Sequence, residues 1–290
     1  MHVVEPPLPE QQAIARFLDH KTAQIDALIA RRKALLAKLA EKRVALISRA
    51  VTRGLDPNAP LKDSGVEWLG EIPAGWIAQR LKFLLSQPLK YGANEAAELD
   101  DRDFPRYIRI TDVRDDGTLR DDTFRSLPPE IAHSYLLDDG DILFARSGAT
   151  VGKTFIYRES WGVAAYAGYL IRARCTPDLD PDFAYHFLQS TIYWEWIKSI
   201  FIQATIQNVS AEKYANLWIT VPPVQEQQAI VQYLDEQTAK IDQQKTRVEQ
   251  AIAKLQEYRA ALITSAVTGK IDVRNIPIPE SNAAQEAVYA

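Results

Sequence analysis

The chain has 290 residues, of which 47% are hydrophobic, with a formal net charge of -4 at pH 7 and one cysteine. This length suffices for one large or two ordinary domains, each with its own core. A single cysteine excludes a disulfide framework and a cysteine-based zinc site, as suits a reducing cytosol. No apolar run approaches the roughly 20 residues that span a membrane. We therefore expect a cytoplasmic protein without membrane contact, and the acidic balance argues mildly against a generic nucleic-acid binder.

A long internal repeat brackets the chain. The segment PPLPEQQAIARFLDHKTAQID, which begins at Pro6, returns as PPVQEQQAIVQYLDEQTAKID from Pro222. The match continues without a gap to Asp56 and Asp272, with roughly half of the positions identical, which marks a duplicated unit. The duplication predicts four parts: a first repeated segment over 1–56, a middle domain over 57–221 with its entry linker, a second repeated segment over 222–272 and a tail over 273–290.

Each repeated segment predicts one long helix. After the opening prolines, neither copy contains a proline or glycine before Gly54 and Gly269, so each helix can run for about 40 residues, or about 60 Å. Apolar residues recur in steps of three and four, which is the pattern of a coiled-coil seam. The predicted seam residues are Ile14, Leu18, Ile25, Leu28, Leu35, Leu39 and Leu46 in the first copy and Ile230, Leu234, Ile241, Val248, Ala251, Leu255, Tyr258 and Leu262 in the second.

The two helices are each other's natural partners. An ordinary core face can show the same stripe, but two matched copies favour a coiled coil. The middle domain connects the end of the first helix to the start of the second. We therefore expect an antiparallel helix pair with the middle domain at one end. Basic residues of the first helix could face DNA phosphates or an acidic partner; they are Arg31, Arg32, Lys33, Lys38, Lys42 and Arg43.

The middle domain is predicted to be α+β. Short β-rich runs alternate with turns: RYIRITDV, DDGTL, GDILFAR, GKTFIYR, AAYAGYLIRAR and LWITV. One segment, PDFAYHFLQSTIYWEWIKSIF from Pro181, keeps a helical period and predicts one amphipathic helix. Its Phe183, Phe187 and Trp194 could stack on bases, but packing on the sheet is the favoured interpretation.

The stretch GDILFARSGATVGKT, from Gly140, is a near match to a phosphate-binding loop. A Walker A loop places four residues between its glycines, whereas three separate Gly148 from Gly152, and Ser147 stands where the first glycine belongs. A turn between two strands is therefore favoured over a nucleotide site.

The sequence shows no catalytic constellation and no metal motif. Its four histidines are scattered, without HExxH spacing or a Cys-His-Asp grouping. What the middle domain does offer is Arg and Lys mixed with Ser, Thr, Asn and Gln near turns, the residue types that contact phosphates and base edges. Each such segment could equally be a solvated loop. The candidate DNA-binding residues are Lys90, Tyr91, Arg109, Thr111, Arg146, Ser147, Thr150, Lys153, Thr205, Gln207 and Asn208.

Three segments resemble the specificity (S) subunits of type I DNA restriction-modification enzymes. EWLGEIPAGW is similar to the opening of their target-recognition domains, GDILFARSGATVGK to their mid-domain signature, and IQNVSAEKYANLWITVPPVQEQQAI to the passage into their conserved helix. The resemblance implies an α+β domain that reads a few base pairs of double-stranded DNA, and paired helices that hold it at a fixed distance from a second reader.

The resemblance also implies partners and their cofactors. Two methylation (M) subunits would carry adenine methylation with S-adenosylmethionine, and a restriction (R) subunit would carry ATP, magnesium and nuclease sites. This chain would then be no enzyme and hold no cofactor. The adenine methyltransferase motif has an aromatic residue after a Pro-Pro pair. In this chain the Pro-Pro pairs are followed by Leu8, Glu130 and Val224, which agrees with a chain that does not itself methylate adenine.

The chain departs from the family pattern in one respect. A complete S subunit is similar to two recognition domains alternating with two conserved helices, whereas one such domain lies here between two helices. We therefore expect a truncated or half-type subunit that works with a second S-type polypeptide or a second copy of itself. The alternative from another class is a coiled-coil adaptor that binds proteins and never touches DNA; a P-loop enzyme ranks third.

Overall fold

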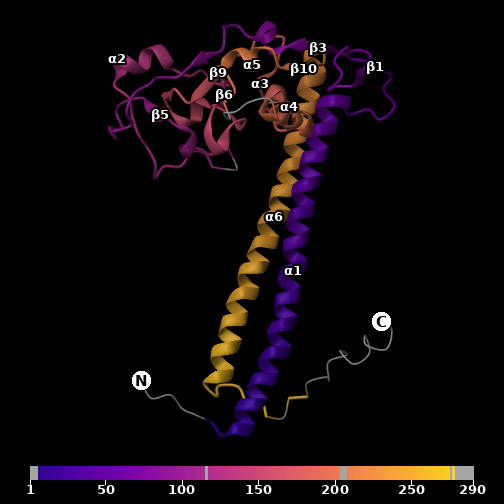
Figure 1. Cartoon of the computed structure of the whole chain (residues 1–290), viewed down its shortest axis with the longest axis vertical. Helices are drawn as coiled ribbons and strands as arrows, with labels where there is room; N and C mark the ends of the chain where they lie inside the picture. The colour runs from indigo at the N-terminus through magenta and orange to yellow at the C-terminus, as the bar shows by residue number, and fades with distance from the viewer. Residues whose placement is uncertain (1–5, 115–116, 203–207, 275, 278–290) are drawn as a thin grey trace. The chain divides into compact units, whose positions relative to one another are not determined.

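The structure is a computed structural model and describes residues 6–114, 117–202, 208–274 and 276–277. The chain forms two compact units, Met1–Glu41 with Ala239–Ala290 and Lys42–Thr238. Two long helices, α1 (Leu8–Arg53) and α6 (Val224–Val267), contribute residues to both units (Figure 1). They confirm the two long helices that the repeat predicts.

A glycine follows the end of each long helix, directly after Arg53 in α1 and two residues after Val267 in α6. Gly54 and Gly269 take the left-handed conformation, with φ of 72° and 71°, which residues with a side chain rarely adopt. The Gly54 amide donates to the Ala50 carbonyl at 3.1 Å, and the Lys270 amide donates to the Ser265 carbonyl at 2.8 Å. These bonds satisfy carbonyls of the last turn that the helix leaves unpaired.

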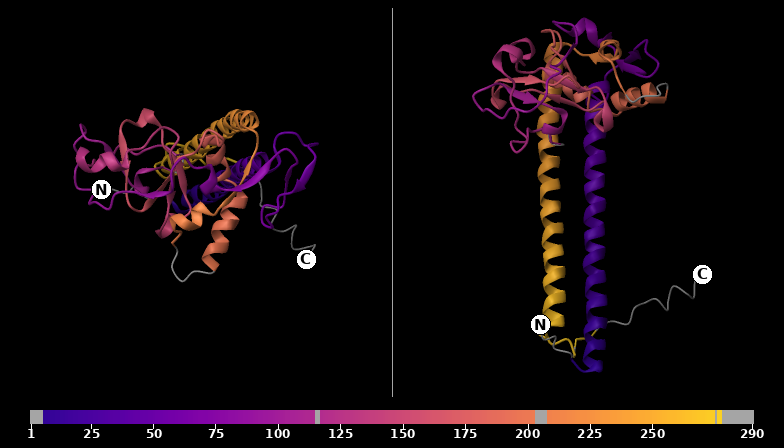
Figure 2. Two further views of the ribbon diagram at one scale, coloured as in Figure 1. Left: turned by 90° about the horizontal axis from the view of Figure 1, so that it is seen from above. Right: turned by 60° about the vertical axis from the view of Figure 1, so that its left-hand side comes forward.

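The smaller unit is an antiparallel helix pair, seen side by side in Figure 1 and in the right-hand view of Figure 2. Residues early in α1 pack against residues late in α6 in one hydrophobic cluster, which contains Ile14, Phe17, Ile25, Ile29, Leu262, Ala266 and Val273. Arg259 of α6 forms an ion pair with Asp26 of α1 through hydrogen bonds of 2.9 and 3.2 Å.

The predicted seam residues differ in burial. Ile14, Ile25, Leu39, Ile230, Leu234, Ile241, Val248 and Leu262 are buried, whereas Leu18, Leu46, Ala251 and Leu255 are half-buried. Leu28, Leu35 and Tyr258 are exposed, at 45%, 38% and 57%. Next to Leu28, it is Ile29 that is buried. A strict heptad repeats every 3.5 residues and drifts against the 3.6 residues per turn of a straight helix, so the buried stripe moves off the heptad positions.

The larger unit holds the sheets. A four-stranded antiparallel sheet has the order β4-β9-β6-β7, built from β4 (Lys90–Tyr91), β9 (Leu170–Ala173), β6 (Ile142–Ala145) and β7 (Thr154–Ile156). Parallel β5 (Arg106–Ile108) and β8 (Ala164–Tyr166) form a second sheet. Two antiparallel pairs complete the strands: β3 (Ile77–Arg80) with β10 (Trp218–Val221), and β1 (Leu61–Asp63) with β2 (Glu71–Pro73).

Short helices surround these sheets. The α-helices are α2 (Pro129–Ala132), α3 (Pro181–Phe187), α4 (Thr191–Ile202) and α5 (Ala211–Ala215). The 3-10 helices are η1 (Leu81–Leu84), η2 (Ile110–Asp112), η3 (His133–Tyr135), η4 (Gly148–Thr150) and η5 (Glu159–Trp161). Helices and strands of this unit confirm the α+β class.

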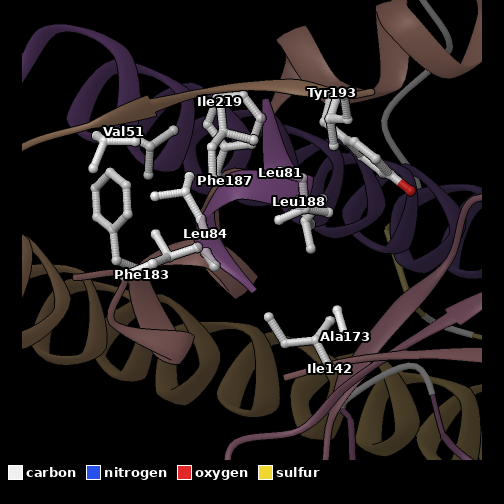
Figure 3. Close-up of a cluster of buried hydrophobic side chains, with 14 of the residues drawn as sticks. Val51, Leu81, Leu84, Ile142, Ala173, Phe183, Phe187, Leu188, Tyr193 and Ile219 are labelled. Carbon is white, nitrogen blue, oxygen red and sulfur yellow. The ribbon is translucent and has the colours of Figure 1, made fainter. Parts of the chain in front are cut away.

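One large core joins the elements of this unit. Figure 3 shows Val51 of α1 and Ile219 of β10 near Phe183 and Phe187 of α3, with Ile142 of the main sheet in the same cluster. The buried Thr220 hydroxyl donates to the Val51 carbonyl at 2.5 Å, so β10 is also tied to α1 by a hydrogen bond.

The predicted single helix from Pro181 is in fact two helices, α3 and α4. The Ser190 hydroxyl donates to the Phe187 carbonyl at 2.6 Å and accepts from the Tyr193 amide at 3.4 Å. A serine that bonds both neighbouring turns in this way ends one helix and caps the next. The expected core role of the aromatics holds for Phe183 and Phe187, which are fully buried, and Trp194 packs against the same cluster.

Candidate nucleic-acid interface

The near match to a phosphate loop is a turn between two strands, as predicted. β6 runs into η4, and the chain returns antiparallel as β7. A phosphate loop instead connects a strand to a helix whose N-terminus faces the phosphates. Gly148 and Gly152 have φ of 77° and 85°, and a Cβ at Gly152 would lie 3.1 Å from atoms of both Trp194 and Ile197. Gly152 therefore lets the turn pack on α4, whereas Gly148 borders open space.

Four of the candidate DNA-binding residues meet beside this turn: Tyr91, Arg146, Ser147 and Asn208, here called the Arg146 cluster. Ser147 and Asn208 form an antiparallel bridge, and the Val209 amide donates to the Arg146 carbonyl at 2.9 Å. The Arg146 guanidinium lies 4.7 Å from the centre of the Tyr91 ring. The Tyr91 hydroxyl in turn accepts from the Ala211 amide at 3.0 Å, which fixes the ring against the start of α5.

The Arg146 guanidinium has no polar partner among the described residues, and its buried Nε is unpaired. Every other arginine between residues 57 and 221 has at least one hydrogen bond or ion pair. The Asn208 Oδ1 is likewise buried and unpaired within the described part of the chain. An aromatic face holds a cation in place without using its N–H donors, so Arg146 keeps donors available for a ligand.

Lys90 points away from the Arg146 cluster. Neighbouring side chains on a strand lie on opposite faces, which separates Lys90 from Tyr91 on β4. The Lys90 ammonium donates to the Ser134 carbonyl at 2.6 Å and lies 5.0 Å from the centre of the Tyr135 ring. Lys90 therefore ties β4 to η3.

Arg109 forms an ion pair and hydrogen bonds inside the fold. Its guanidinium forms two hydrogen bonds with the buried Asp112 carboxylate, at 3.1 and 2.8 Å, and a third with the Thr123 carbonyl at 2.8 Å. Thr111, on η2, is exposed. Burying the Asp112 carboxylate requires such a cation, so Arg109 stabilises the loop around η2.

Thr150 and Lys153 line a separate cavity of about 190 Å³, together with Arg114, Gln189 and Trp194. Within the described residues, no member of the Arg146 cluster lines it. Thr205 and Gln207, the remaining candidates, lie outside the described residues.

Sequence reasoning missed two residues next to the Arg146 cluster, the buried Gly92 and the exposed Tyr169. A Cβ at Gly92 would lie 2.2 and 2.4 Å from the carbonyl oxygens of Tyr166 and Ala167, so only glycine allows these backbones to meet. Tyr169 is 67% exposed, and its carbonyl accepts from the Arg146 amide at 3.1 Å. The sequence offered one local signal for Gly92, which is that a glycine directly follows the candidate pair Lys90 and Tyr91.

Two further observations concern the described residues as a whole. None of the described helices is both long and apolar enough to cross a membrane. Within the same residues, no three side chains of His, Cys, Asp or Glu are grouped so as to hold a metal ion.

Comparison with known proteins agrees with this architecture. Residues 94–253 match the family model "Type I restriction modification DNA specificity domain". The chain is 26% identical over 278 residues to the type I restriction enzyme EcoBI specificity subunit of Escherichia coli, covering 92% of this chain and 57% of that protein. It is 27% identical over 212 residues to the EcoKI specificity subunit of Escherichia coli strain K12, covering 70% and 44%. The chain thus spans about half the length of these relatives.

Solved structures show the same fold. One chain, from a study of complex assembly and conformational transition of the type I R-M system, matches with a TM-score of 0.68 at 18% identity, over 90% of this chain and 60% of that one. The HsdS subunit of Thermoanaerobacter tengcongensis matches with a TM-score of 0.53 at 20% identity, over 92% and 60%. Because the family model covers more than half of its residues, this chain belongs to the type I restriction modification DNA specificity domain family.

Proposed function

We propose that this chain is the DNA sequence-recognition subunit of a type I restriction-modification complex. Its middle domain, residues 57–221, binds one half of a bipartite target through the Arg146 cluster. The observation that carries this proposal is the guanidinium of Arg146, which is stacked on Tyr91 and has no polar partner among the described residues, in a chain of a DNA specificity family. The Asn208 Oδ1, from the residue that bridges Ser147, is likewise unpaired within that part of the chain.

The chemistry of the Arg146 cluster suits base edges. Arginine donates two parallel hydrogen bonds to guanine O6 and N7, and asparagine pairs with adenine N6 and N7. Stacking on Tyr91 holds the guanidinium before the ligand arrives, which lowers the entropy that is lost on binding. The serine hydroxyl of Ser147 adds a donor and acceptor of the kind that contacts phosphate or base.

The other candidates divide by their contacts. Thr150 and Lys153 remain proposed backbone contacts, because hydroxyls and ammonium groups suit phosphates, and Thr111, Thr205 and Gln207 remain candidates on residue type alone. Lys90 and Arg109 rank below the Arg146 cluster, because the Lys90 ammonium already donates to the Ser134 carbonyl and the Arg109 guanidinium already donates to Asp112 and the Thr123 carbonyl. The chain itself is non-catalytic in this proposal: adenine methylation with S-adenosylmethionine belongs to methylation subunits, and ATP- and magnesium-dependent cleavage to a restriction subunit, both held by the long helices.

Arg146→Ala tests the assignment in the complex of this chain with the methylation subunits of its host. Methylome sequencing of the host, with and without the gene, first identifies the target. The substitution should then reduce affinity for the target by about tenfold to a hundredfold, as the loss of one bidentate base contact does. Affinity for unrelated DNA should change little.

Arg146→Lys is the matched control, because it keeps the charge and removes the planar fork. It should resemble alanine if Arg146 reads a base and the wild type if Arg146 only meets a phosphate. A host methylome that is unchanged when the gene is deleted, with a wild-type complex that shows no sequence preference, would instead support the protein adaptor.

A further inference from the structure

Two cations converge on a single amide oxygen in the larger unit. Arg80 Nη1 donates to Asn216 Oδ1 at 3.0 Å, and Lys82 Nζ donates to the same oxygen at 3.1 Å. Arg80 ends β3, Lys82 lies in η1 and Asn216 directly follows α5. In Figure 1 the labels of β3, β10 and α5 lie close together at this part of the domain.

The arrangement has two positive charges and no carboxylate. Among the described residues, neither Arg80 nor Lys82 forms an ion pair. Their shared acceptor is a neutral amide, so the charges repel each other at close range. A bound anion would remove that repulsion and accept charge-assisted hydrogen bonds from both groups.

Neighbouring residues hold the three side chains in position. The Arg80 guanidinium lies 5.2 Å from the centre of the Trp218 ring, and the Lys82 ammonium lies 5.2 Å from that of Phe83. Asn216 Nδ2 donates to the Glu212 carbonyl at 2.9 Å, which orients Oδ1 toward the cations. Contacts with aromatic faces restrict the long side chains and leave N–H donors free to bind.

Helix α5 connects this site to the Arg146 cluster. The amide of Ala211 at its start donates to the Tyr91 hydroxyl, and Asn216 follows its other end. Five residues of helix rise about 7.5 Å, so the two places are neighbours along one short element. An open cavity of about 420 Å³ lies beside α5 and is lined by Trp196, Ile200, Ser210, Glu212, Lys213 and Asn216.

We propose that Arg80, Lys82 and Asn216 form a phosphate grip that binds a phosphodiester of the DNA backbone next to the Arg146 cluster. This inference rests on the proposed function and deepens it, because it separates a group that positions DNA from one that reads it. Phosphate contacts set register and orientation without carrying sequence information. The whole chain is acidic, so a local pair of unneutralised cations gives the phosphates a place to bind.

The test is Lys82→Ala and Lys82→Glu in the complex with the methylation subunits, with Lys62→Ala and Lys62→Glu as matched controls. Lys62 is an exposed lysine of β1 in the same unit, so its variants make the same charge changes. Fluorescence anisotropy with target and unrelated duplexes at several salt concentrations measures affinity and its salt dependence.

Lys82→Ala should weaken binding to both duplexes by the same factor, about fivefold, and lower the slope of log affinity against log salt by about 0.9, the effect of one lost phosphate contact. Lys82→Glu should weaken binding further, with the methylated sequence unchanged. Equal DNA affinities and equal salt slopes for the Lys82 and Lys62 variants overturn the inference. A Lys82 variant that co-purifies less with the methylation subunits but keeps its DNA affinity overturns it as well. Failure of the proposed function is distinguishable, because the wild-type complex would then show no sequence preference.

Discussion

Gly92 lies where two backbone segments meet more closely than any side chain allows. A Cβ there would lie within 2.6 Å of three backbone atoms of Tyr166 and Ala167, and backbone cannot move aside as a flexible side chain can. We expect Gly92→Ala to lower the free energy of unfolding by about 3 kcal/mol or more, the upper range for overpacking. Gly75→Ala is the control, because nothing lies within 4 Å of its Cβ position. Urea unfolding of both variants checks the prediction, and equal midpoints would contradict it.

Cys175 gives a pH-dependent prediction at the same scale. Burial raises the pKa of its thiol to about 12, whereas an exposed thiol titrates near 8.5. Only the thiolate reacts, so at pH 8 alkylation of the folded chain should be roughly a thousandfold slower than that of the unfolded chain. The rate should keep rising with pH above 9, where an ordinary thiol is already ionised. Because this is the single cysteine, mass spectrometry of the labelled protein reports it alone; rapid labelling of folded protein at pH 8 would contradict the raised pKa.

At the scale of elements, apolar residues of α1 differ in how deeply they are buried. Ile25 is buried in the cluster that joins α1 and α6, whereas Leu35 of the same helix is 38% exposed. We expect Ile25→Ala to lower the free energy of unfolding by about 2 to 5 kcal/mol, as for other buried aliphatic side chains. Leu35→Ala should change it by less than about 1 kcal/mol, since alanine favours helix and little area is lost. Circular dichroism during urea unfolding measures both, and equal losses would place Leu35 in a further interface.

At the scale of the whole molecule, the duplicated helices and the middle domain are proposed to have separate tasks. Replacing residues 57–221 with the corresponding domain of another specificity subunit should change the methylated sequence and leave co-purification with the methylation subunits intact. The physical reason is that base readout depends on the side chains of the middle domain, whereas assembly would depend on the long helices. Methylome sequencing of the chimaera checks the change of methylated sequence, and affinity purification checks the retained assembly. An unchanged methylated sequence would argue against separate tasks for the helices and the middle domain.

The sequence by itself determined the long helices, their duplication, the α+β class and the turn between β6 and β7. These features depend on local and periodic properties: the absence of Pro and Gly over long stretches, an apolar stripe, and glycines at positive φ. It did not determine which stripe positions are buried, because a small mismatch in period accumulates along a long helix. It also missed the break at Ser190, where one hydroxyl bonds two helices.

Only the tertiary structure decided which candidate cations remain available for a ligand. Arg109 and Arg146 look alike in the sequence, as arginines next to a turn. In the fold, Arg109 neutralises Asp112 and bonds the Thr123 carbonyl, whereas Arg146 stacks on Tyr91 and meets no hydrogen-bond acceptor among the described residues. Arg80 and Lys82 drew no attention in the sequence, because their shared acceptor, Asn216, lies far along the chain. Whether a charge is neutralised or left unpaired depends on contacts between distant residues, and those exist only once the chain has folded.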